Sequence, residues 1–423
     1  MRFLRYVFNQ LISSKYLRNI VVLSGGVGSS QLITLILLPI LTRFFSPSDF
    51  GVFALFMSII QLFAISFTFR LEMAIILPSK NTDAVLLSFM SLLCLIIGSF
   101  LSVCIVFLLE NFFKYSIIFG FDTQLFYLIP LGAFFLGLYN ILYCWNNRLE
   151  KYSRMSVSQI VHSTISTPSS LLFYYLSFQS IGLVLGQILG RLLACFILLN
   201  DLYMNLRLLK SKDMYNDCYR LWSKYKKFPL FELPQAILNF MSQKYVIAFF
   251  MLYFGSFAVG LFDLADKILG KPLSVISNSF KTVFYQRLTT AKNKRSIFLK
   301  SLVLMFLIGL CLTLPFYFIP DSFFVFILGH HWGDIGQYIQ LICPLLFSRF
   351  VFTVISPSIS YTLKNHLLLI WQIIYFVLLI ILFWIFRDNS IEKVLFVYAT
   401  FGALMYFLLG LISYLVLIKN IKQ

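Results

Sequence analysis

The chain has 423 residues, of which 60% are hydrophobic and 12% are charged, and its formal net charge is +18 at pH 7. Charged residues make up about a quarter of an ordinary soluble domain, so this composition excludes a soluble globular protein. Long apolar runs recur from one end to the other and leave no stretch for a sizeable soluble domain, which indicates an integral membrane protein.

Twelve apolar runs of about 20 residues, the length that a helix needs to cross a bilayer, predict an all-α polytopic protein. The first run follows several basic residues and superficially resembles a secretory leader. It is too long for a leader and lacks a small-residue cleavage site, so we expect an uncleaved span. The expected spans are 20–42, 50–69, 85–109, 123–144, 156–178, 180–200, 229–254, 256–279, 297–319, 338–362, 366–386 and 394–417.

One long polar segment divides these spans into six and six. We therefore expect an N-terminal six-helix bundle over 1–200, a basic linker over 201–228 and a C-terminal bundle over 229–423. A short phrase around Gly51 recurs around Gly260, 209 positions later, between the first two spans of each half. Parallel repeats of this kind are a transporter architecture with the substrate site between the bundles. The alternative explanation is that glycine and aromatic residues commonly follow a break between membrane spans, without any repeat.

The basic residues are distributed unevenly across the membrane. With an even number of spans, 24 Lys and Arg fall on the side of the termini and 4 on the opposite side. The positive-inside rule then places both termini in the cytoplasm, and it explains the net charge without nucleic acid as a partner. The basic linker also suits contact with anionic lipid headgroups.

Ionisable residues inside the expected spans are the candidate functional residues, because a charge at bilayer depth needs a partner or a wet cavity. Arg191 and Arg349, one in each half, fall about 11 residues into their spans, near the middle of the bilayer. Asp263, Lys267 and Lys271 are spaced by four and are expected to share one helix face that looks into water or onto a bound anion. The remaining candidates are Lys244, Asp266, Arg70 with Glu72, and Glu232.

For Arg70, Glu72 and Glu232, which lie at the inner ends of their spans, an interfacial ion pair or a snorkelling side chain is an equally good explanation. Signals of an enzyme are weak. The seven cysteines are odd in number and lie mostly in apolar spans, so we expect small core residues without disulfides. The sequence His330-His331-Trp332-Gly333-Asp334 lacks a third metal ligand and is interpreted as an aromatic anchor in an outer loop. We expect no metal, no cofactor and no enzymatic activity.

Several short motifs together resemble one family. They are Thr42-Arg43-Phe44-Phe45-Ser46-Pro47 through Asp49-Phe50-Gly51, Arg70-Leu71-Glu72 through Leu77-Pro78, Trp145-Asn146-Asn147-Arg148, Lys227-Phe228-Pro229 with Pro234, Val259-Gly260-Leu261-Phe262-Asp263-Leu264-Ala265 into Ile268-Leu269-Gly270-Lys271-Pro272-Leu273-Ser274, and Val283-Phe284-Tyr285-Gln286-Arg287. In order and spacing they resemble the oligosaccharide flippases of the multidrug/oligosaccharidyl-lipid/polysaccharide (MOP) superfamily. Asp263, Lys267 and Lys271 are departures from that family's fixed features.

The resemblance implies a V-shaped transporter of two six-helix lobes around a central cationic cavity. Its implied function is to carry an undecaprenyl-diphosphate-linked oligosaccharide, such as the O-antigen repeat unit of lipopolysaccharide, across a bacterial inner membrane by alternating access. Arg191, Arg349, Lys267, Lys271, Lys244 and Arg70 are the expected substrate-binding residues. Asp263, Asp266 and Glu232 are the expected site for a proton or sodium counter-ion. Membrane lipids and other polysaccharide assembly proteins are the remaining expected partners.

Two alternatives come from other functional classes. A multidrug or cation antiporter of the same superfamily would bind cations and should carry acidic cavity residues. A membrane glycan polymerase or ligase would need a substantial outer loop with acid and base groups, and the longest outer connections here are 110–122 and 320–337.

Overall fold

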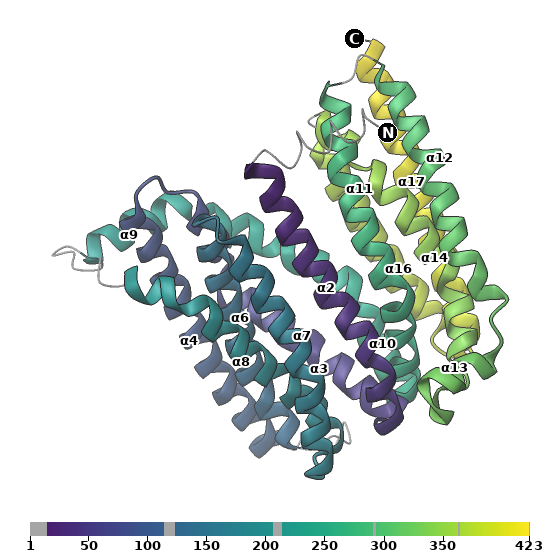
Figure 1. The fold of residues 1–423 in the computed structure, drawn as a ribbon, viewed down its shortest axis with the longest axis horizontal. Helices are drawn as coiled ribbons and strands as arrows, with labels where there is room; N and C mark the ends of the chain where they lie inside the picture. The colour runs from purple at the N-terminus through teal and green to yellow at the C-terminus, as the bar shows by residue number, and fades with distance from the viewer. Residues whose placement is uncertain (1–14, 114–122, 206–213, 291–292, 363, 423) are drawn as a thin grey trace. The chain divides into compact units, whose positions relative to one another are not determined.

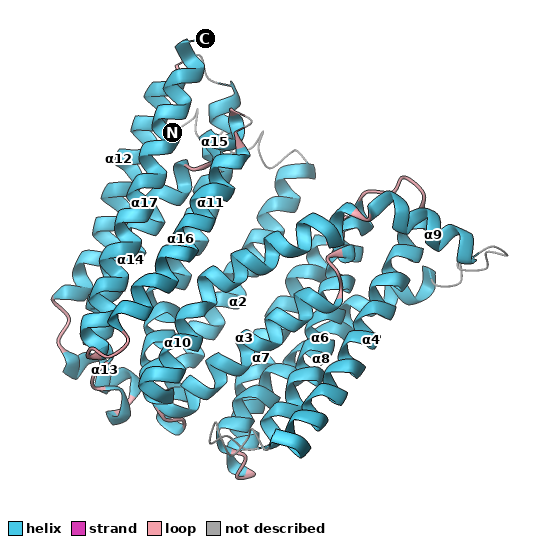
Figure 2. Ribbon diagram, turned by 180° about the vertical axis from the view of Figure 1, so that it is seen from behind, coloured by secondary structure: helices cyan, strands magenta, loops and turns pink. Residues whose placement is uncertain are grey.

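A computed structural model of the protein describes residues 15–113, 123–205, 214–290, 293–362 and 364–422 (Figure 1). Within these ranges every regular element is a helix and none is a strand, as Figure 2 shows, so the all-α prediction is confirmed. Most of the expected outer connection 110–122, residues 206–213 of the expected linker and most of the basic N-terminal segment lie outside the described residues.

Ten described helical segments are long and apolar enough to cross a membrane. The difference from twelve expected spans has two causes. The helix Tyr152–Tyr175 is rich in buried serine and threonine, which lowers its mean hydropathy. The run Phe228–Tyr285 covers two expected spans without a break in helical assignment, although Gly255, with φ 78° and ψ 179°, marks a kink inside it. The boundary between the expected spans 7 and 8 is therefore this single non-helical glycine.

The chain divides into two compact units. Unit 1 consists of Met1–Phe44 and Leu55–Met241, and unit 2 consists of Phe45–Ala54 and Ser242–Gln423. Two helices continue from one unit into the other: α3 (Pro47–Phe67) and α10 (Leu233–Ala265). The division into residues 1–200, 201–228 and 229–423 stays a prediction.

Unit 1 is a helix bundle in which α7 packs against α2 and α8, and α6 packs against α4 and α8. Its helices are α2 (Lys15–Phe44), the Leu55–Phe67 part of α3, α4 (Asn81–Phe113), α6 (Thr123–Arg148), α7 (Tyr152–Tyr175), α8 (Gln179–Asn205) and α9 (Met214–Tyr225). Small residues allow close contact of helices inside a membrane. A Cβ on Gly26 would collide with Ser156 of α7, and a Cβ on Gly186 of α8 would collide with Ser170. The serine-rich character of α7 is thus a packing feature.

One end of unit 1 is held together by Arg148, the last residue of α6. Its guanidinium donates to the backbone carbonyls of Ile75 (3.2 Å), Ile76 (3.3 Å) and Pro78 (2.6 Å), and to the side-chain oxygen of Asn81 (3.1 Å). Ile75 and Ile76 end the 3₁₀ turn η1 (Leu71–Ile76), and Pro78 and Asn81 follow it. The motif that ends in Arg148 and the motif that ends in Pro78 are therefore parts of one joint.

Unit 2 is built around α14, which contacts α11, α12 and α17. Its helices after α10 are the π-helical turn η4 (Asp266–Gly270), α11 (Lys271–Thr290), α12 (Lys294–Thr313), α13 (Asp321–Leu328), α14 (Ile335–Ile355), α15 (Pro357–Tyr361), α16 (Asn365–Phe386) and α17 (Ile391–Lys422). A second π-helical turn, η3 (Phe228–Glu232), precedes α10 in unit 1.

The repeated phrase has a structural explanation inside unit 2. A Cβ on Gly51 would overlap the carbonyl oxygen of Ser256, and a Cβ on Gly260 would overlap the carbonyl oxygen of Pro47. Each glycine therefore faces the residue four positions before the other glycine. The two copies pack on each other reciprocally, with backbone against backbone, which only residues without a side chain permit.

Packing also corrects the expected role of Trp332. The indole is fully buried, and its ring lies edge-on to the ring of Phe50 with 5.2 Å between centroids. The expectation of an aromatic anchor in an outer loop is wrong, because Trp332 is a core residue that packs on the first copy of the repeated phrase.

Candidate functional site

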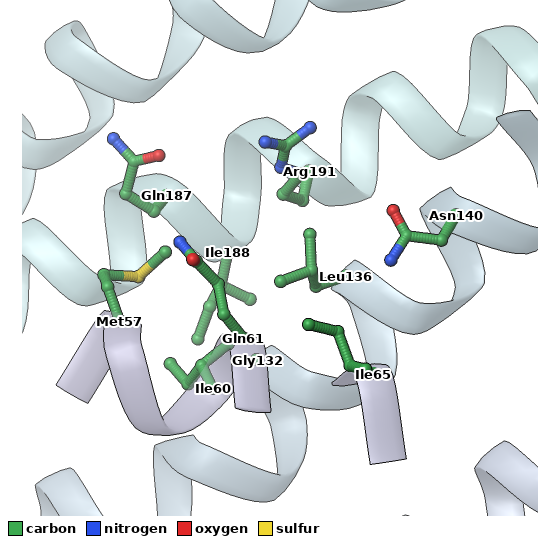
Figure 3. A pocket seen from close by; sticks show the side chains of 10 residues that line it. All are labelled: Met57, Ile60, Gln61, Ile65, Gly132, Leu136, Asn140, Gln187, Ile188 and Arg191. Atoms are coloured by element: carbon green, nitrogen blue, oxygen red, sulfur yellow. The ribbon is translucent and has the colours of Figure 1, made fainter. Parts of the chain in front are cut away.

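A polar cavity of about 250 Å³ lies within unit 1, between α3, α6 and α8. Its lining combines one cation, three amides and apolar side chains: Met57, Ile60, Gln61, Ile65, Gly132, Leu136, Asn140, Gln187, Ile188 and Arg191. In Figure 3 the amide group of Asn140 turns toward the middle of the view, that of Gln61 lies to the left of the middle, and the guanidinium of Arg191 lies above both. A cavity of this size holds part of a large ligand, such as a phosphate or one sugar ring, since whole-ligand pockets run from about 300 to 1,000 Å³.

Arg191 is held by an aromatic ring. Its guanidinium carbon lies 4.6 Å from the ring centroid of Tyr139, which is a cation–π contact. The Tyr139 hydroxyl in turn forms a hydrogen bond with Ser158 Oγ at 3.2 Å, so the ring is anchored to α7. Arg191 is partly exposed. The tyrosine thus holds the guanidinium in place at the cavity.

The cavity has no internal counter-charge. None of the ten lining residues carries a carboxylate, and among the described residues Arg191 forms no ion pair. A cation at bilayer depth without an acidic partner attracts an anion or water. The cavity is therefore suited to an anionic group flanked by hydroxyls, which the amides can both donate to and accept from.

In unit 2 the expected face of acidic and basic residues forms ion pairs. Lys267 Nζ lies 2.5 Å from Asp263 Oδ2, the favourable acid-first pair four residues apart. Lys267 Nζ also lies 4.8 Å from the ring centroid of Phe53 and 5.7 Å from that of Phe50. Asp263, which replaces the Ala54 of the first copy, therefore positions a lysine against the aromatic residues of that copy.

The second ion pair joins α14 to the π-helical turn. Arg349 Nη2 donates to Asp266 Oδ1 at 3.0 Å, and about a third of each side chain is exposed. A Cβ on Gly270 would lie 2.5 Å from that carboxylate oxygen and 2.9 Å from the guanidinium nitrogen. Gly270 thus leaves the room in which Arg349 and Asp266 meet.

The π-helical turn Asp266–Gly270 interrupts the helix face that Asp263, Lys267 and Lys271 were expected to share. Residues after the turn are rotated relative to residues before it. The backbone N–H of Lys271 consequently donates to the carbonyl of Asp266, five residues earlier. Arg349, Lys244 and Lys271 all interact electrostatically with the Asp266 carboxylate. In the described part of unit 2, Arg349 therefore contacts Asp266 directly, Lys244 and Lys271 act on the same carboxylate, and Lys267 contacts Asp263.

The remaining expected residues lie in unit 1. Arg70 adopts a left-handed conformation with φ 57°, and its Nη1 lies 3.5 Å from Oε1 of Glu72, whose side chain is only 2% exposed. Arg70 and Glu72 thus form an ion pair, which was one of the two alternatives to a role in substrate binding. Glu232 is exposed on the π-helical turn before α10. It belongs to a different unit from Asp263 and Asp266, so the three acids of the expected ion site are not gathered within either unit.

Sequence reasoning missed four residues around Arg191: Gln61, Asn140, Gln187 and Tyr139. Amides and tyrosines occur throughout the spans, and only their rotation about the helix axis separates cavity residues from packing residues. Asn140 and Gln187 within otherwise apolar stretches were the available signal, because a polar side chain in a span needs a partner or a cavity. Groups of three or more possible metal ligands are absent from the described residues.

Comparison with known proteins places the chain in a family. Residues 40–337 match the family model described as polysaccharide biosynthesis protein. No curated protein matches the chain. Among solved structures, the fold is similar to an inward-facing multidrug resistance transporter of the MATE family and MOP superfamily, with a TM-score of 0.68, 14% identity, and coverage of 93% of this chain and 94% of that one.

Two further solved structures share this fold. The lipid II flippase MurJ in an inward closed conformation has a TM-score of 0.60 at 16% identity, over 95% of this chain and 88% of that one. A MOP superfamily transporter from Pyrococcus furiosus has a TM-score of 0.54 at 13% identity, over 98% of both chains. Because the family match covers well over half of the 423 residues, the chain belongs to the polysaccharide biosynthesis protein family, and its fold is that of MOP superfamily transporters.

Proposed function

We propose that the protein is a flippase that moves a polyisoprenoid-diphosphate-linked oligosaccharide from the inner to the outer leaflet of a bacterial cytoplasmic membrane by alternating access. The observation that carries this proposal is Arg191, a cation without an acidic partner among the described residues, on a cavity lined by three amides. Membership of the polysaccharide biosynthesis family supports a glycan substrate. The likeness to a lipid II flippase supports the coarser class of transporter, since it is a likeness of fold.

The physical task of such a protein is to keep the headgroup out of hydrocarbon. Burying one bare ion costs on the order of 20 kcal/mol in the idealised limit, and a diphosphate with several sugars would cost more. A guanidinium matches two phosphate oxygens at once, and amides match sugar hydroxyls. Arg191 is thus assigned to the diphosphate, and Gln61, Asn140 and Gln187 are assigned to the adjoining sugar.

Unit 2 is assigned supplementary charge. We assign Arg349, Lys244 and Lys271 to a second contact with the anionic headgroup, because they outnumber the one carboxylate, Asp266, with which they interact. Lys267, paired with Asp263, and Arg70, paired with Glu72, are assigned weaker roles, because each already has a partner. A proton or sodium ion that resets the empty carrier is assigned to Asp263, Asp266 or Glu232.

The membrane potential would favour this direction of transport. An interior-negative potential acts with about 2.3 kcal/mol per charge per 100 mV, so two negative charges that move outward gain roughly 4–5 kcal/mol at 100 mV. The gain depends only on the outward movement of the charge and not on the orientation of the chain. The excess of basic residues on the side of the termini supports cytoplasmic termini. The same bias supports a bacterial inner membrane as the location, with other polysaccharide assembly proteins as neighbours.

The proposal is tested with purified protein in liposomes that contain a fluorescent polyisoprenoid-diphosphate oligosaccharide. Transport is followed as the fraction of headgroups that a membrane-impermeant reagent can reach. We expect Arg191→Ala to abolish transport and Arg191→Lys to restore part of it. Lysine keeps the charge but cannot bind two phosphate oxygens at once as a guanidinium does. Arg387→Ala is the control, because Arg387 lies beside Asp388 and Trp384 and outside both sites.

Wild-type transport by Arg191→Ala would remove Arg191 from the mechanism. Transport of organic cations by the wild-type protein, with no movement of the lipid-linked glycan, would replace the flippase by the multidrug antiporter. An increase in glycan chain length during the assay would instead identify a polymerase.

A further inference from the structure

Helix α9 presents a packed face and an exposed aromatic face. Four of its side chains pack on the core of unit 1: Met214, Cys218, Leu221 and Tyr225. Three aromatic side chains remain outside, with Tyr215 83% exposed, Tyr219 69% and Trp222 39%. At about 100° per residue, the three exposed positions fall within about 60° of one another and about 100° from the packed face. The exposed aromatic face therefore flanks the face on which α9 rests.

Contacts place α9 at one end of the unit 1 bundle. Arg220 Nη2 lies 2.9 Å from Asp83 Oδ1, and Asp83 is in the first turn of α4. Arg148, which ends α6, bonds to Asn81 at the start of α4. The apolar spans Asn81–Leu108 and Leu125–Arg148 thus begin and end at the level of α9, and Figure 1 shows α9 beside this end of α4. This level is the boundary between hydrocarbon and water.

Three exposed cations follow at the end of α9, and one of them, Lys226, lies beside the aromatic face. Lys224, Lys226 and Lys227 are exposed, and none of them has a carboxylate partner among the described residues. At 100° per residue, Lys226 falls on the same side of the helix as Tyr219 and Trp222. The surface therefore combines aromatic rings, which prefer the membrane interface, with ammonium groups that have no internal counter-charge.

From this combination we infer that α9 is a binding site for anionic phospholipids. The rings of Tyr215, Tyr219 and Trp222 lie among the outer acyl carbons, and Lys226, on the same side of the helix, contacts a phosphate. Lys224 and Lys227 add positive charge at this end of α9. Charge complementarity selects an anionic headgroup, and the level of α9 at the end of two membrane spans means that lipid is its lateral neighbour. This site is independent of the transported substrate. It ties the end of unit 1 to the leaflet surface.

The test uses the full-length protein in nanodiscs whose lipids carry brominated acyl chains, which quench nearby tryptophan fluorescence. Trp222 is one of five tryptophans, so its contribution is the difference between wild type and Trp222→Phe. We compare discs in which only phosphatidylglycerol is brominated with discs of the same composition in which only phosphatidylcholine is brominated. The difference signal should be quenched by both lipids, and by phosphatidylglycerol several-fold more efficiently.

In the triple variant Lys224→Gln, Lys226→Gln, Lys227→Gln, quenching by phosphatidylglycerol should fall several-fold, to the efficiency of phosphatidylcholine, while quenching by phosphatidylcholine persists. A matched triple variant, Arg295→Gln, Lys300→Gln, Lys419→Gln, removes the same charge from unit 2 and should keep the preference. Two outcomes would overturn the inference. One is an unquenched Trp222 signal, which would mean that the aromatic face meets water or a protein partner. The other is equal quenching by the two lipids in the wild-type protein.

Discussion

Replacing Gly51 by alanine should separate the two copies of the repeated phrase. The new methyl carbon would overlap the Ser256 carbonyl oxygen and lie 3.0 Å from the Ser256 Cα, whereas ordinary contacts of a Cβ begin at about 3.4 Å. The obstacle is backbone, so rotation of a side chain cannot relieve it, and the two helix segments must move apart. Overpacking of this kind costs about 1–3 kcal/mol, and a backbone collision belongs at the upper end. Separation would also weaken the Phe50–Trp332 and Lys267–Phe53 contacts.

The assay is thermal unfolding of the purified protein in detergent. It measures the fraction of protein that remains folded at each temperature. Gly28→Ala is the matched control, because Gly28 lies in α2 and a Cβ there would meet nothing within 4 Å. Alanine has a higher helix propensity than glycine by about 1 kcal/mol, so the control should be neutral or slightly stabilised. We expect Gly51→Ala to unfold several degrees below Gly28→Ala.

Gly260→Ala should behave in the same way, since its Cβ would overlap the Pro47 carbonyl oxygen and approach the backbone nitrogen of Gly51 to 3.1 Å. One separation relieves both collisions, so the double variant should lose less stability than the sum of the single variants. If Gly51→Ala and Gly28→Ala unfolded at the same temperature, the reciprocal packing described for unit 2 would be refuted.

Three further predictions concern the polar groups. Arg148→Ala should lower the free energy of unfolding by about 2–4 kcal/mol, because several acceptors at the joint lose their donor, and Arg148→Lys should recover less than half of the loss in the same unfolding assay. Arg349→Ala should be less stable than the double variant Arg349→Ala, Asp266→Ala, since the single change leaves a carboxylate without its partner; equal stability would show that the pair contributes nothing. Gly270→Ala should alter transport more than stability, because its methyl group meets only side-chain atoms of that pair, and the liposome assay separates the two effects.

Much of the fold could be predicted from the sequence. Length and apolarity are sufficient to locate helices in a membrane, so the expected spans correspond to long helices. Hydropathy was least informative for α7, whose serines and threonines face neighbouring helices, and at Gly255, where one backbone conformation separates two helical stretches. Packing decides both cases, and hydropathy does not measure packing.

The site was less predictable. The charges at bilayer depth were visible, but their partners were not, because pairing depends on contacts between distant helices. Arg191 and Arg349 looked equivalent in sequence, yet Arg349 meets Asp266 while Arg191 stacks on Tyr139 beside an uncharged cavity. The π-helical turn at Asp266–Gly270 was also invisible, and it divides residues that a regular helix would align.

The reciprocal contact of Gly51 and Gly260 has a consequence for inheritance. Each copy of the phrase is the surface against which the other copy must fit. Mutations at the two glycines, and at Pro47 and Ser256, are therefore not independent events, and the four positions should evolve together as one unit. Positions outside the contact carry no such restriction. Asp263 is one such position: it stands where the first copy has Ala54, and its side chain pairs with Lys267 and not with the backbone contact of the glycines.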